Sequence, residues 1–200
     1  MIEAILFDIG NVLLNFDYRR AVKALAEHAQ VPANEMAEVL DELHGLHETG
    51  QFTKLQYFTE VARRTGFKNS EEIFHQAFSD IFTPNEPMWE FVRPLFGKVP
   101  VYLFSNISER HETWIFEKYP ELKRFNGGFF SWRMGCMKPD PEYYRKALEV
   151  LPHAPERMAY FDDLHPNVMA GTACGLQAIR YLADDHAAFL REVGERQLLE

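Results

Sequence analysis

The sequence is poor in cysteine and has no cluster of basic residues. Only 2 of its 200 residues are cysteine, Cys136 and Cys174. This is too few for a disulfide framework and indicates a reducing compartment. Lys and Arg total 21 against 30 Asp and Glu, a net charge of −9, and basic residues never occur in runs longer than two. Nucleic-acid binding needs a basic footprint, so we expect no nucleic acid partner.

Long apolar runs are also missing from the sequence. No stretch approaches the length of a membrane span, and we expect no membrane partner. The first residues lead directly into a strand-like segment, which leaves no room for a signal peptide. The sequence therefore predicts a soluble, cytoplasmic protein. Its length of 200 residues suits one α/β domain with a modest insertion.

Short apolar segments alternate with helical patterns along much of the chain. The run at residues 4–7 lacks polar alternation, which is typical of a strand buried on both faces. Similar segments lie at residues 99–104, 128–131, 157–161 and 177–181. Helical patterns separate these segments, which predicts βα units and a parallel sheet. We expect a three-layer, Rossmann-like α/β core.

A long block after the first strand has helical patterns only. Apolar residues recur with helical spacing in four segments, at residues 17–30, 33–47, 54–65 and 70–82. No segment of this block predicts a strand. We therefore expect a helical cap at residues 15–85, inserted after the first strand of a core formed by residues 1–14 and 86–200.

Polar side chains follow each of the first four predicted strands. In chain order they are Asp8, the pair Ser105 and Asn106, Lys138, and the pair Asp162 and Asp163. Taken singly, each fits an ordinary role as a turn residue, a helix cap or a solvated charge. Open α/β sheets, however, bind their ligands at the carboxyl ends of the strands. The order of these residues at consecutive strand ends therefore indicates one shared crevice.

Four segments together carry a resemblance to a known family: FDIGNVL, VYLFSN, MKPDPEYY and YFDDLHPNV. Over essentially its whole length the chain resembles the haloacid dehalogenase-like (HAD) hydrolase superfamily. It is similar to the capped phosphatases, and among them to bacterial glucose-1-phosphate phosphatase-like members. The resemblance implies a phosphatase that hydrolyses a small phosphorylated metabolite, such as a sugar 1-phosphate. We expect a monomer or a weak homodimer.

The resemblance also implies roles for the residues at the strand ends. Asp8 and Lys138 would be catalytic: Asp8 would attack phosphorus and form an aspartyl-phosphate that water then hydrolyses. Ser105, the amide of Asn106 and Lys138 would hold the phosphoryl oxygens.

A Mg²⁺ ion is the cofactor that the resemblance implies. Its ligands would be Asp8, the main-chain carbonyl of Gly10 and Asp163, since Mg²⁺ prefers oxygen ligands. Asp162 would contact the water shell of the ion or lie behind the ligands. Asn167 would steady the acidic loop from the start of the next helix.

The sequence departs from the family at one position that matters for chemistry. Most phosphatases of this family have a second Asp two residues after the nucleophile, as general acid and base, whereas this chain has Gly10. General acid catalysis is worth about 10² to 10⁴ in rate. The loop at residues 45–50 is expected to reach over the site, where His44, His47 or Glu48 would select the substrate or supply the proton. The two histidines also have a spacing that zinc sites use, but the sequence offers no third ligand.

Two alternatives remain open at this stage. The dehalogenases of the superfamily also lack the second Asp, but their motif has an aromatic residue where this chain has Gly10, and they need no Mg²⁺. A catalytically silent member that binds a metabolite is the other alternative. The retention of Asp8, Lys138 and both acids of the Asp162–Asp163 pair argues against it, since a binder needs no nucleophile.

Overall fold

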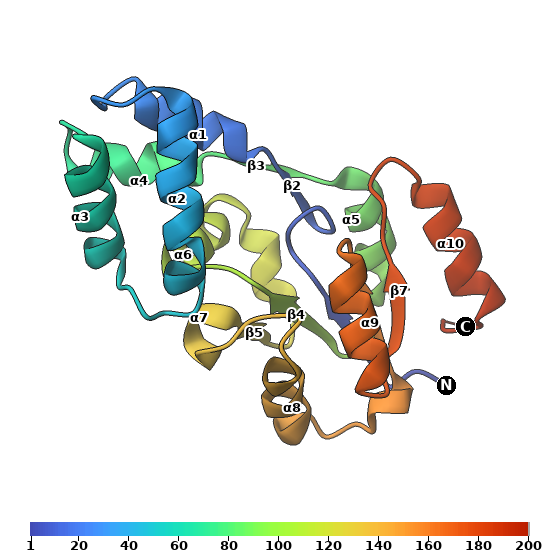
Figure 1. Cartoon of the computed structure of the whole chain (residues 1–200). Helices are drawn as coiled ribbons and strands as arrows, with labels where there is room; N and C mark the ends of the chain where they lie inside the picture. The colour runs from blue at the N-terminus through green and yellow to red at the C-terminus, as the bar shows by residue number, and fades with distance from the viewer. Residues whose placement is uncertain (200) are drawn as a thin grey trace.

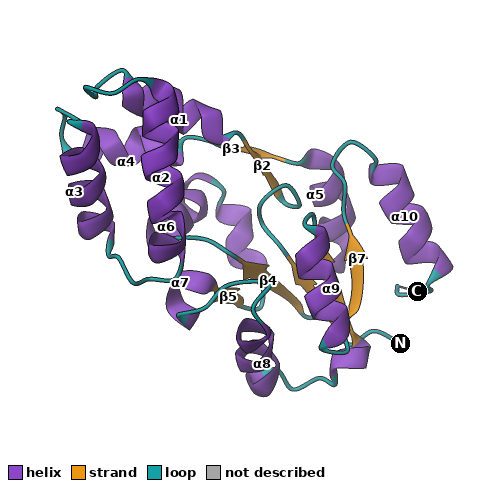
Figure 2. Cartoon of the chain, in the orientation of Figure 1, coloured by secondary structure: helices purple, strands orange, loops and turns teal. Residues whose placement is uncertain are grey.

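A computed structural model describes residues 1–199 and contains one sheet of five parallel strands (Figure 2). The strand order is β5-β4-β1-β6-β7. The bounds are Ala4–Phe7 for β1, Val101–Ser105 for β4, Gly128–Phe130 for β5, Met158–Asp162 for β6 and Gln177–Arg180 for β7. Leu6 of β1 lies between Tyr102 of β4 and Tyr160 of β6, so β1 is the central strand. This position explains why its residues are all buried.

Helices cover both faces of this sheet. Ile5 and Phe7 point to the face covered by α5 (Glu86–Val92) and α10 (His186–Glu195). Ala4 and Leu6 belong to a second cluster on the other face, under α8 (Pro141–Val150) and α9 (His165–Ala173). Successive residues of a strand point to opposite faces, so an apolar run without alternation can fill both layers. The predicted three-layer α/β fold is confirmed.

Four helices follow the first strand and lie together at one end of the molecule (Figure 1). Their bounds are Tyr18–Ala26 for α1, Ala33–Glu48 for α2, Lys54–Thr65 for α3 and Glu71–Ser79 for α4. Local sequence explains where two of them begin. Thr53 and Gln56 form a capping box before α3, and the Ser70 hydroxyl accepts the backbone N–H of Ile73 before α4.

The helical block is joined to the sheet by a short antiparallel ribbon that the sequence analysis missed. Strands β2 (Leu14–Phe16) and β3 (Phe82–Pro84) pair at the two ends of the block. Each strand has three residues, too few to show a period of two, and β3 follows directly on a helical pattern. The prediction that residues 15–85 contain no strand is therefore wrong at both edges.

The remaining elements are two helices between β4 and β6 and three turns of 3-10 helix. Helix α6 (Glu109–Lys118) follows β4, and the short helix α7 (Ser131–Met134) follows β5 and begins at Ser131, which the sequence pattern places at the end of a strand. Three turns of 3-10 helix complete the described chain, at Arg93–Leu95, Pro120–Arg124 and Pro155–Arg157. None of the helices in residues 1–199 combines the length and the apolar character that a membrane span needs.

Candidate active site

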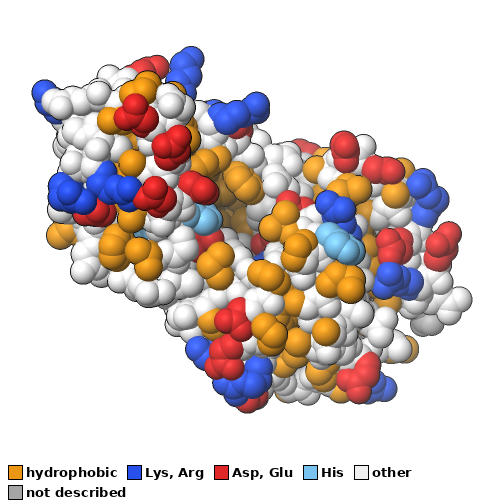
Figure 3. Space-filling view, viewed as in Figure 1, with side chains coloured by type: hydrophobic (Ala, Val, Ile, Leu, Met, Phe, Trp, Pro, Cys, Tyr) orange, Lys and Arg blue, Asp and Glu red, His pale blue; other side chains and the backbone are white. Residues whose placement is uncertain are grey.

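A cavity of about 460 Å³ lies between the carboxyl ends of the strands and the helical block. The space-filling view shows the molecule hollowed between these two parts (Figure 3). We call the side that carries Asp8, Lys138 and Asp163 the floor, together with Asp162 directly behind it. We call the side that carries Tyr18 of α1 and His44 and Glu48 of α2 the roof.

Asp8 follows β1 directly and is buried at the floor. Its backbone N–H donates to the Phe161 carbonyl (2.9 Å), and its Oδ1 accepts the backbone N–H of Ile9 (2.7 Å). The Nζ of Lys138 lies 3.2 Å from the same Oδ1. Burial raises the pKa of Asp8 to about 7, an effect that Lys138 opposes and the two neighbouring acids reinforce. Further positive charge nearby would therefore stabilise the ionised carboxylate of Asp8.

Lys138 is fixed by three oxygen atoms in the interior. Its Nζ donates to Oδ2 of Asp162 (2.6 Å) and to the Phe104 carbonyl (2.6 Å), in addition to its ion pair with Asp8. Burial alone would lower the pKa of Lys138, but the charges of Asp162 and Asp8 outweigh it and hold this pKa above its ordinary value. The floor therefore contains a permanent, immobile cation.

Asp162 accepts hydrogen bonds on both carboxylate oxygens. Oδ2 accepts from Lys138 and from the Tyr160 hydroxyl (2.5 Å), while Oδ1 accepts the backbone N–H of Leu164 (2.9 Å). Asn167 Nδ2 donates to Oδ1 at 3.0 Å and lies 3.2 Å from Oδ2. Burial would raise the pKa of Asp162, yet Lys138 keeps it below its ordinary value. Asp162 thus anchors Lys138, and Asn167 holds Asp162.

Asp163 is oriented by Asn11, a residue that the sequence analysis does not single out. Asn11 has φ of 52°, in the left-handed region that Asn tolerates better than most residues. Its Nδ2 donates to Oδ2 of Asp163 (3.1 Å). Burial raises the pKa of Asp163, and the hydrogen bond from Asn11 opposes this shift. The available signal was the sequence Gly10-Asn11, a turn pair directly after the strand.

The acids of the floor fit a hard divalent cation. One oxygen each of Asp8, Asp162 and Asp163 lies within 4.8 Å of the other two. Hard cations take such oxygen ligands. The bridge between Gly10 and Leu14 uses the Ile9 carbonyl and the Asn11 N–H, so the Gly10 carbonyl takes no part in it. Since the oxygens of Asp162 already accept hydrogen bonds, this donor set favours Asp8 and Asp163 as direct ligands.

Ser105 and Asn106 end β4 beside these residues. Ser105 is buried and lines the cavity. The Asn106 side chain has a role that the sequence does not reveal, because it exchanges two hydrogen bonds with the backbone of Lys138. Its Nδ2 donates to the Lys138 carbonyl (2.8 Å), and its Oδ1 accepts the Lys138 N–H (2.8 Å). Asn106 therefore ties the lysine loop to the end of β4.

Gly10 lies beside an aromatic ring. Its backbone is outside the left-handed region, so glycine is not required there for its conformation. A Cβ at this position would lie 3.1 Å from Cε1 and 3.4 Å from Cδ1 of Phe16. Phe16 is 43% exposed, which gives its ring room to move. The obstacle to a larger residue at position 10 is this ring.

The structure separates the three residues predicted for the helical block. His44 and Glu48 form an ion pair (Nε2 to Oε2, 3.1 Å) and both line the cavity. His47 does not line it. Its ring is 3% exposed and stacks on Tyr57 with 4.1 Å between centroids. Helix spacing alone does not separate the histidines, because residues three and four apart share a helix face. The packing of α2 decides: His44 and Glu48 lie at the cavity, and His47 packs into the aromatic interior of the helical block.

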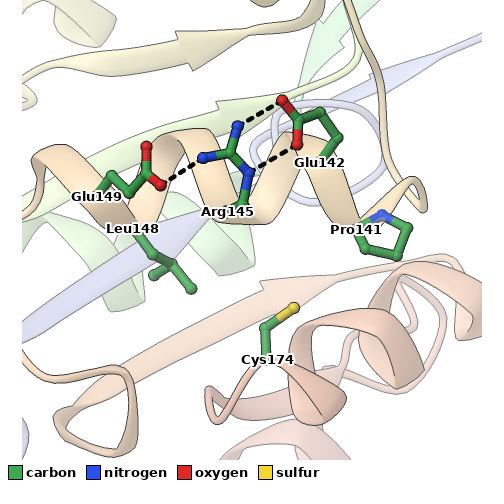
Figure 4. A pocket seen from close by; sticks show the side chains of 6 residues that line it. All are labelled: Pro141, Glu142, Arg145, Leu148, Glu149 and Cys174. Carbon is green, nitrogen blue, oxygen red and sulfur yellow. Dashed lines mark hydrogen bonds and ion pairs between the residues drawn. The ribbon is translucent and has the colours of Figure 1, made fainter.

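A second hollow lies elsewhere on the surface, against α8. It is lined by Pro141, Glu142, Arg145, Leu148, Glu149 and Cys174 (Figure 4). Arg145 is held by Glu142 and Glu149, so its charge is already matched. Because this hollow has no free charged group and lies apart from Asp8, we assign the chemistry to the cavity above the floor.

Two curated proteins are similar to the chain in sequence. One is the Phosphorylated carbohydrates phosphatase of Thermotoga maritima, 24% identical over 184 residues that cover 88% of this chain and 83% of that protein. The other is Drimenol cyclase drtB of Aspergillus calidoustus, 22% identical over 92% of this chain. The chain spans only 35% of the length of that cyclase.

A solved structure and a family model complete the comparison. A HAD family enzyme of Bacteroides thetaiotaomicron, crystallised with magnesium and inorganic phosphate, superposes with a TM-score of 0.83 at 22% identity. The match covers 92% of this chain and 96% of that one, and it shows a shared fold. The model of the haloacid dehalogenase-like hydrolases matches residues 2–175. The chain therefore belongs to the haloacid dehalogenase-like hydrolase family.

Proposed function

We propose that this hydrolase is a Mg²⁺-dependent phosphatase that acts on a small phosphorylated metabolite, such as a sugar 1-phosphate. The observation that carries the proposal is the convergence of Asp8, Lys138 and the Asp162–Asp163 pair on one cavity. A carboxylate buried beside a fixed cation and further acids suits attack on a phosphoryl group next to a bound metal ion.

Asp8 is the nucleophile in this proposal. Its Oδ1 accepts the Ile9 N–H and faces Lys138, which leaves Oδ2 to attack phosphorus. The attack forms an aspartyl-phosphate, and water then hydrolyses it and restores the carboxylate. Lys138, the Ser105 hydroxyl and the amide of Asn106 hold the phosphoryl oxygens. Phosphoryl transfer depends mainly on such positioning and on charge neutralisation.

Asp8, the Gly10 carbonyl and Asp163 are the proposed ligands of Mg²⁺, with Asp162 behind them. When bound, the ion would neutralise charge on the phosphoryl group and on the crowded carboxylates. The pKa of Asp8, raised to about 7 by burial, supports this assignment, because a nearby cation favours the ionised form that attacks.

The helical segment 15–85 is proposed to act as a cap over the core 1–14 and 86–200. It contributes the roof of a cavity whose volume, about 460 Å³, lies within the ~300–1,000 Å³ typical of small-molecule sites. The polar groups of the roof, Tyr18, His44 and Glu48, suit a hydroxylated leaving group. The similarity to a phosphatase of phosphorylated carbohydrates supports a sugar phosphate as the substrate class.

Phosphate release from para-nitrophenyl phosphate and from a panel of phosphorylated metabolites tests the proposal. We expect release with Mg²⁺, none in EDTA, and a loss of at least about 10²-fold in Asp163→Asn, which removes a ligand charge. Full activity in EDTA would contradict the metal assignment. Halide release from 2-haloacids without metal would identify a dehalogenase instead, and turnover of neither substrate class would identify a silent binder.

A further inference from the structure

The roof contains a polar pair directly across the cavity from the floor. His44 and Glu48 lie one helical turn apart on α2, and Nε2 of His44 is 3.1 Å from Oε2 of Glu48. The two side chains differ in exposure, with 43% for His44 and 11% for Glu48. Both side chains line the cavity, and the histidine is the more accessible of the two. Nδ1 is the ring nitrogen that is not turned towards Glu48.

His44 is also the roof group suited to carry a transferable proton near neutral pH. Burial lowers the pKa of His111, which lines the cavity from α6, to about 3, so its ring stays neutral. Burial raises the pKa of Tyr18 to about 12. The hydrogen bond that His44 donates to Glu48, by contrast, raises the pKa of His44 above its ordinary value. Of these three groups, His44 is therefore the one suited to release and take up a proton near neutral pH, whereas His111 and Tyr18 are not.

The floor has no proton donor on the side where the leaving oxygen would depart. Position 10 is glycine, and the adjacent space is taken by the ring of Phe16, which cannot donate a proton. Lys138 is held by Asp162, Asp8 and the Phe104 carbonyl. A leaving oxygen that departs towards the roof therefore meets His44 rather than an acid of the floor.

We propose that His44, oriented by Glu48, is the general acid that protonates the leaving oxygen, and this assignment rests on the proposed phosphatase function. In the first step Oδ2 of Asp8 bonds to phosphorus, the bond from phosphorus to the leaving oxygen breaks, and the imidazolium of His44 transfers its proton to that oxygen. The products are an alcohol, neutral His44 and the aspartyl-phosphate. In the second step neutral His44 accepts a proton from the attacking water, which releases hydrogen phosphate and restores both the imidazolium and the Asp8 carboxylate.

The charges around His44 set the pH range of this proton transfer. On its own helix it faces Glu48, with Asp41 also raising its pKa. The ring of Tyr18 on α1 meets it edge-on at 6.4 Å between centroids. From α6 it faces His111, which is neutral, and across the cavity are the charged groups of the floor: Asp8, Lys138 and Asp163. Glu48 is the partner in direct contact and therefore the one to change.

A leaving-group series in the full-length chain tests the assignment. The measured quantity is kcat/KM, which reports the steps up to departure of the leaving group and not the later hydrolysis that all substrates share. In His44→Gln, we expect kcat/KM on para-nitrophenyl phosphate to fall less than about 5-fold, because that leaving group is acidic and needs little protonation. On phenyl phosphate and glucose 1-phosphate, kcat/KM should fall about 10²-fold or more. His153→Gln, a histidine beside Glu3 and away from the cavity, is the matched control and should behave as wild type.

The other outcomes of this series overturn the proposal. An equal loss of kcat/KM on every leaving group would assign His44 a structural role. A higher KM with unchanged kcat would assign it to the recognition of substrate hydroxyls. His44→Asn, measured in parallel with a thermal unfolding midpoint for each variant, separates these results from a folding defect, since the half-exposed ring leaves space for either amide.

Glu48 is a positioning residue in this proposal, and its test is a pH profile. For wild type, kcat/KM on glucose 1-phosphate should fall at alkaline pH as His44 loses its proton. In Glu48→Gln this limb should move to lower pH by about 1 unit, because the amide keeps a hydrogen bond but not the charge. In His44→Gln the limb should disappear. An unmoved limb in both variants would overturn the proposal, whereas a wild-type chain that hydrolyses none of these esters would overturn the phosphatase function itself.

Discussion

The floor and the roof of the cavity are built in different ways. The floor joins residues from three segments far apart in sequence, and buried hydrogen bonds of 2.5 to 3.2 Å connect them through Asp162 and Lys138. The roof comes from the helical block, whose interior is aromatic: His47 stacks on Tyr57, and Phe74 stacks on Phe78. The polar pair of the roof, His44 and Glu48, is formed by two residues one turn apart on the same helix.

This difference predicts different responses to mutation. A buried ionic network loses both charge balance and hydrogen bonds when one member is removed, which is strongly destabilising. The His44–Glu48 pair, in which the histidine is 43% exposed, is partly screened by solvent, so it contributes less to stability and is free to vary with the substrate. The floor should therefore be intolerant of change, and the roof should alter selectivity without unfolding the chain.

The largest effect is expected for Asp8, the proposed nucleophile of the floor. Asp8→Asn should lower kcat at least about 10³-fold on every phosphate ester, because the amide cannot form the acyl-phosphate. Its circular dichroism spectrum should match wild type, since the amide keeps the shape of the side chain. Phosphate release by Asp8→Asn at a normal rate would show that Asp8 is not the nucleophile.

Removal of the buried cation should be the next largest effect, and it concerns stability. Lys138→Met keeps the length of the side chain but leaves Asp162 and Asp8 without their counter-charge. Breaking a buried pair costs about 3 to 5 kcal/mol, and urea unfolding measures this cost. Glu48→Gln at the roof is the comparison, with an expected cost below about 1 kcal/mol. Equal costs for the two variants would contradict the distinction between floor and roof.

A histidine inside the helical block should make stability depend on pH. Burial lowers the pKa of His47 to about 4; the backbone of Phe52 lies near, but neither ring nitrogen makes a hydrogen bond within residues 1–199. The folded chain keeps His47 neutral while the unfolded chain protonates it below about pH 6.5, so its contribution is lost as pH falls. His47→Phe should reduce the difference in unfolding free energy between pH 7 and pH 5 by about 2 kcal/mol.

The comparison that checks this effect is His28→Phe, a histidine on the exposed surface. It should leave the difference between the two pH values as in wild type. If His47→Phe behaves in the same way as His28→Phe, the buried ring already carries its proton at pH 5 and the assignment of a lowered pKa is wrong.

The smallest effect is expected at Gly10. Gly10→Asp would place an acid beside the leaving oxygen, and the exposed ring of Phe16 has only to move by a few tenths of an ångström. We expect hydrolysis of primary esters such as glucose 6-phosphate to rise about 10-fold relative to para-nitrophenyl phosphate. The ratio of the two rates in Gly10→Asp and in Gly10→Ala, the matched control for size, measures the gain. If the ratio rises only in Gly10→Ala, the gain comes from movement of Phe16 and not from the added acid.

Much of the fold follows from local pattern. The buried run at β1 predicts a central parallel strand because only such a strand is apolar on both faces, and the Thr53 and Ser70 caps predict where α3 and α4 begin. The short strands β2 and β3 escaped prediction, since three residues show no period and their pairing joins segments nearly seventy residues apart.

The chemical identity of the floor was also visible in the sequence, because Asp8, Lys138 and the Asp162–Asp163 pair each follow a predicted strand. The hydrogen-bond partners of these floor residues became known only from the tertiary structure. Asn11 and Asn106 hold Asp163 and the Lys138 backbone through contacts between segments far apart in sequence, and no local pattern encodes such contacts. The same holds at the roof: spacing alone treats His44 and His47 as equivalent, and the packing of α2 sends one to the cavity and the other into the aromatic interior.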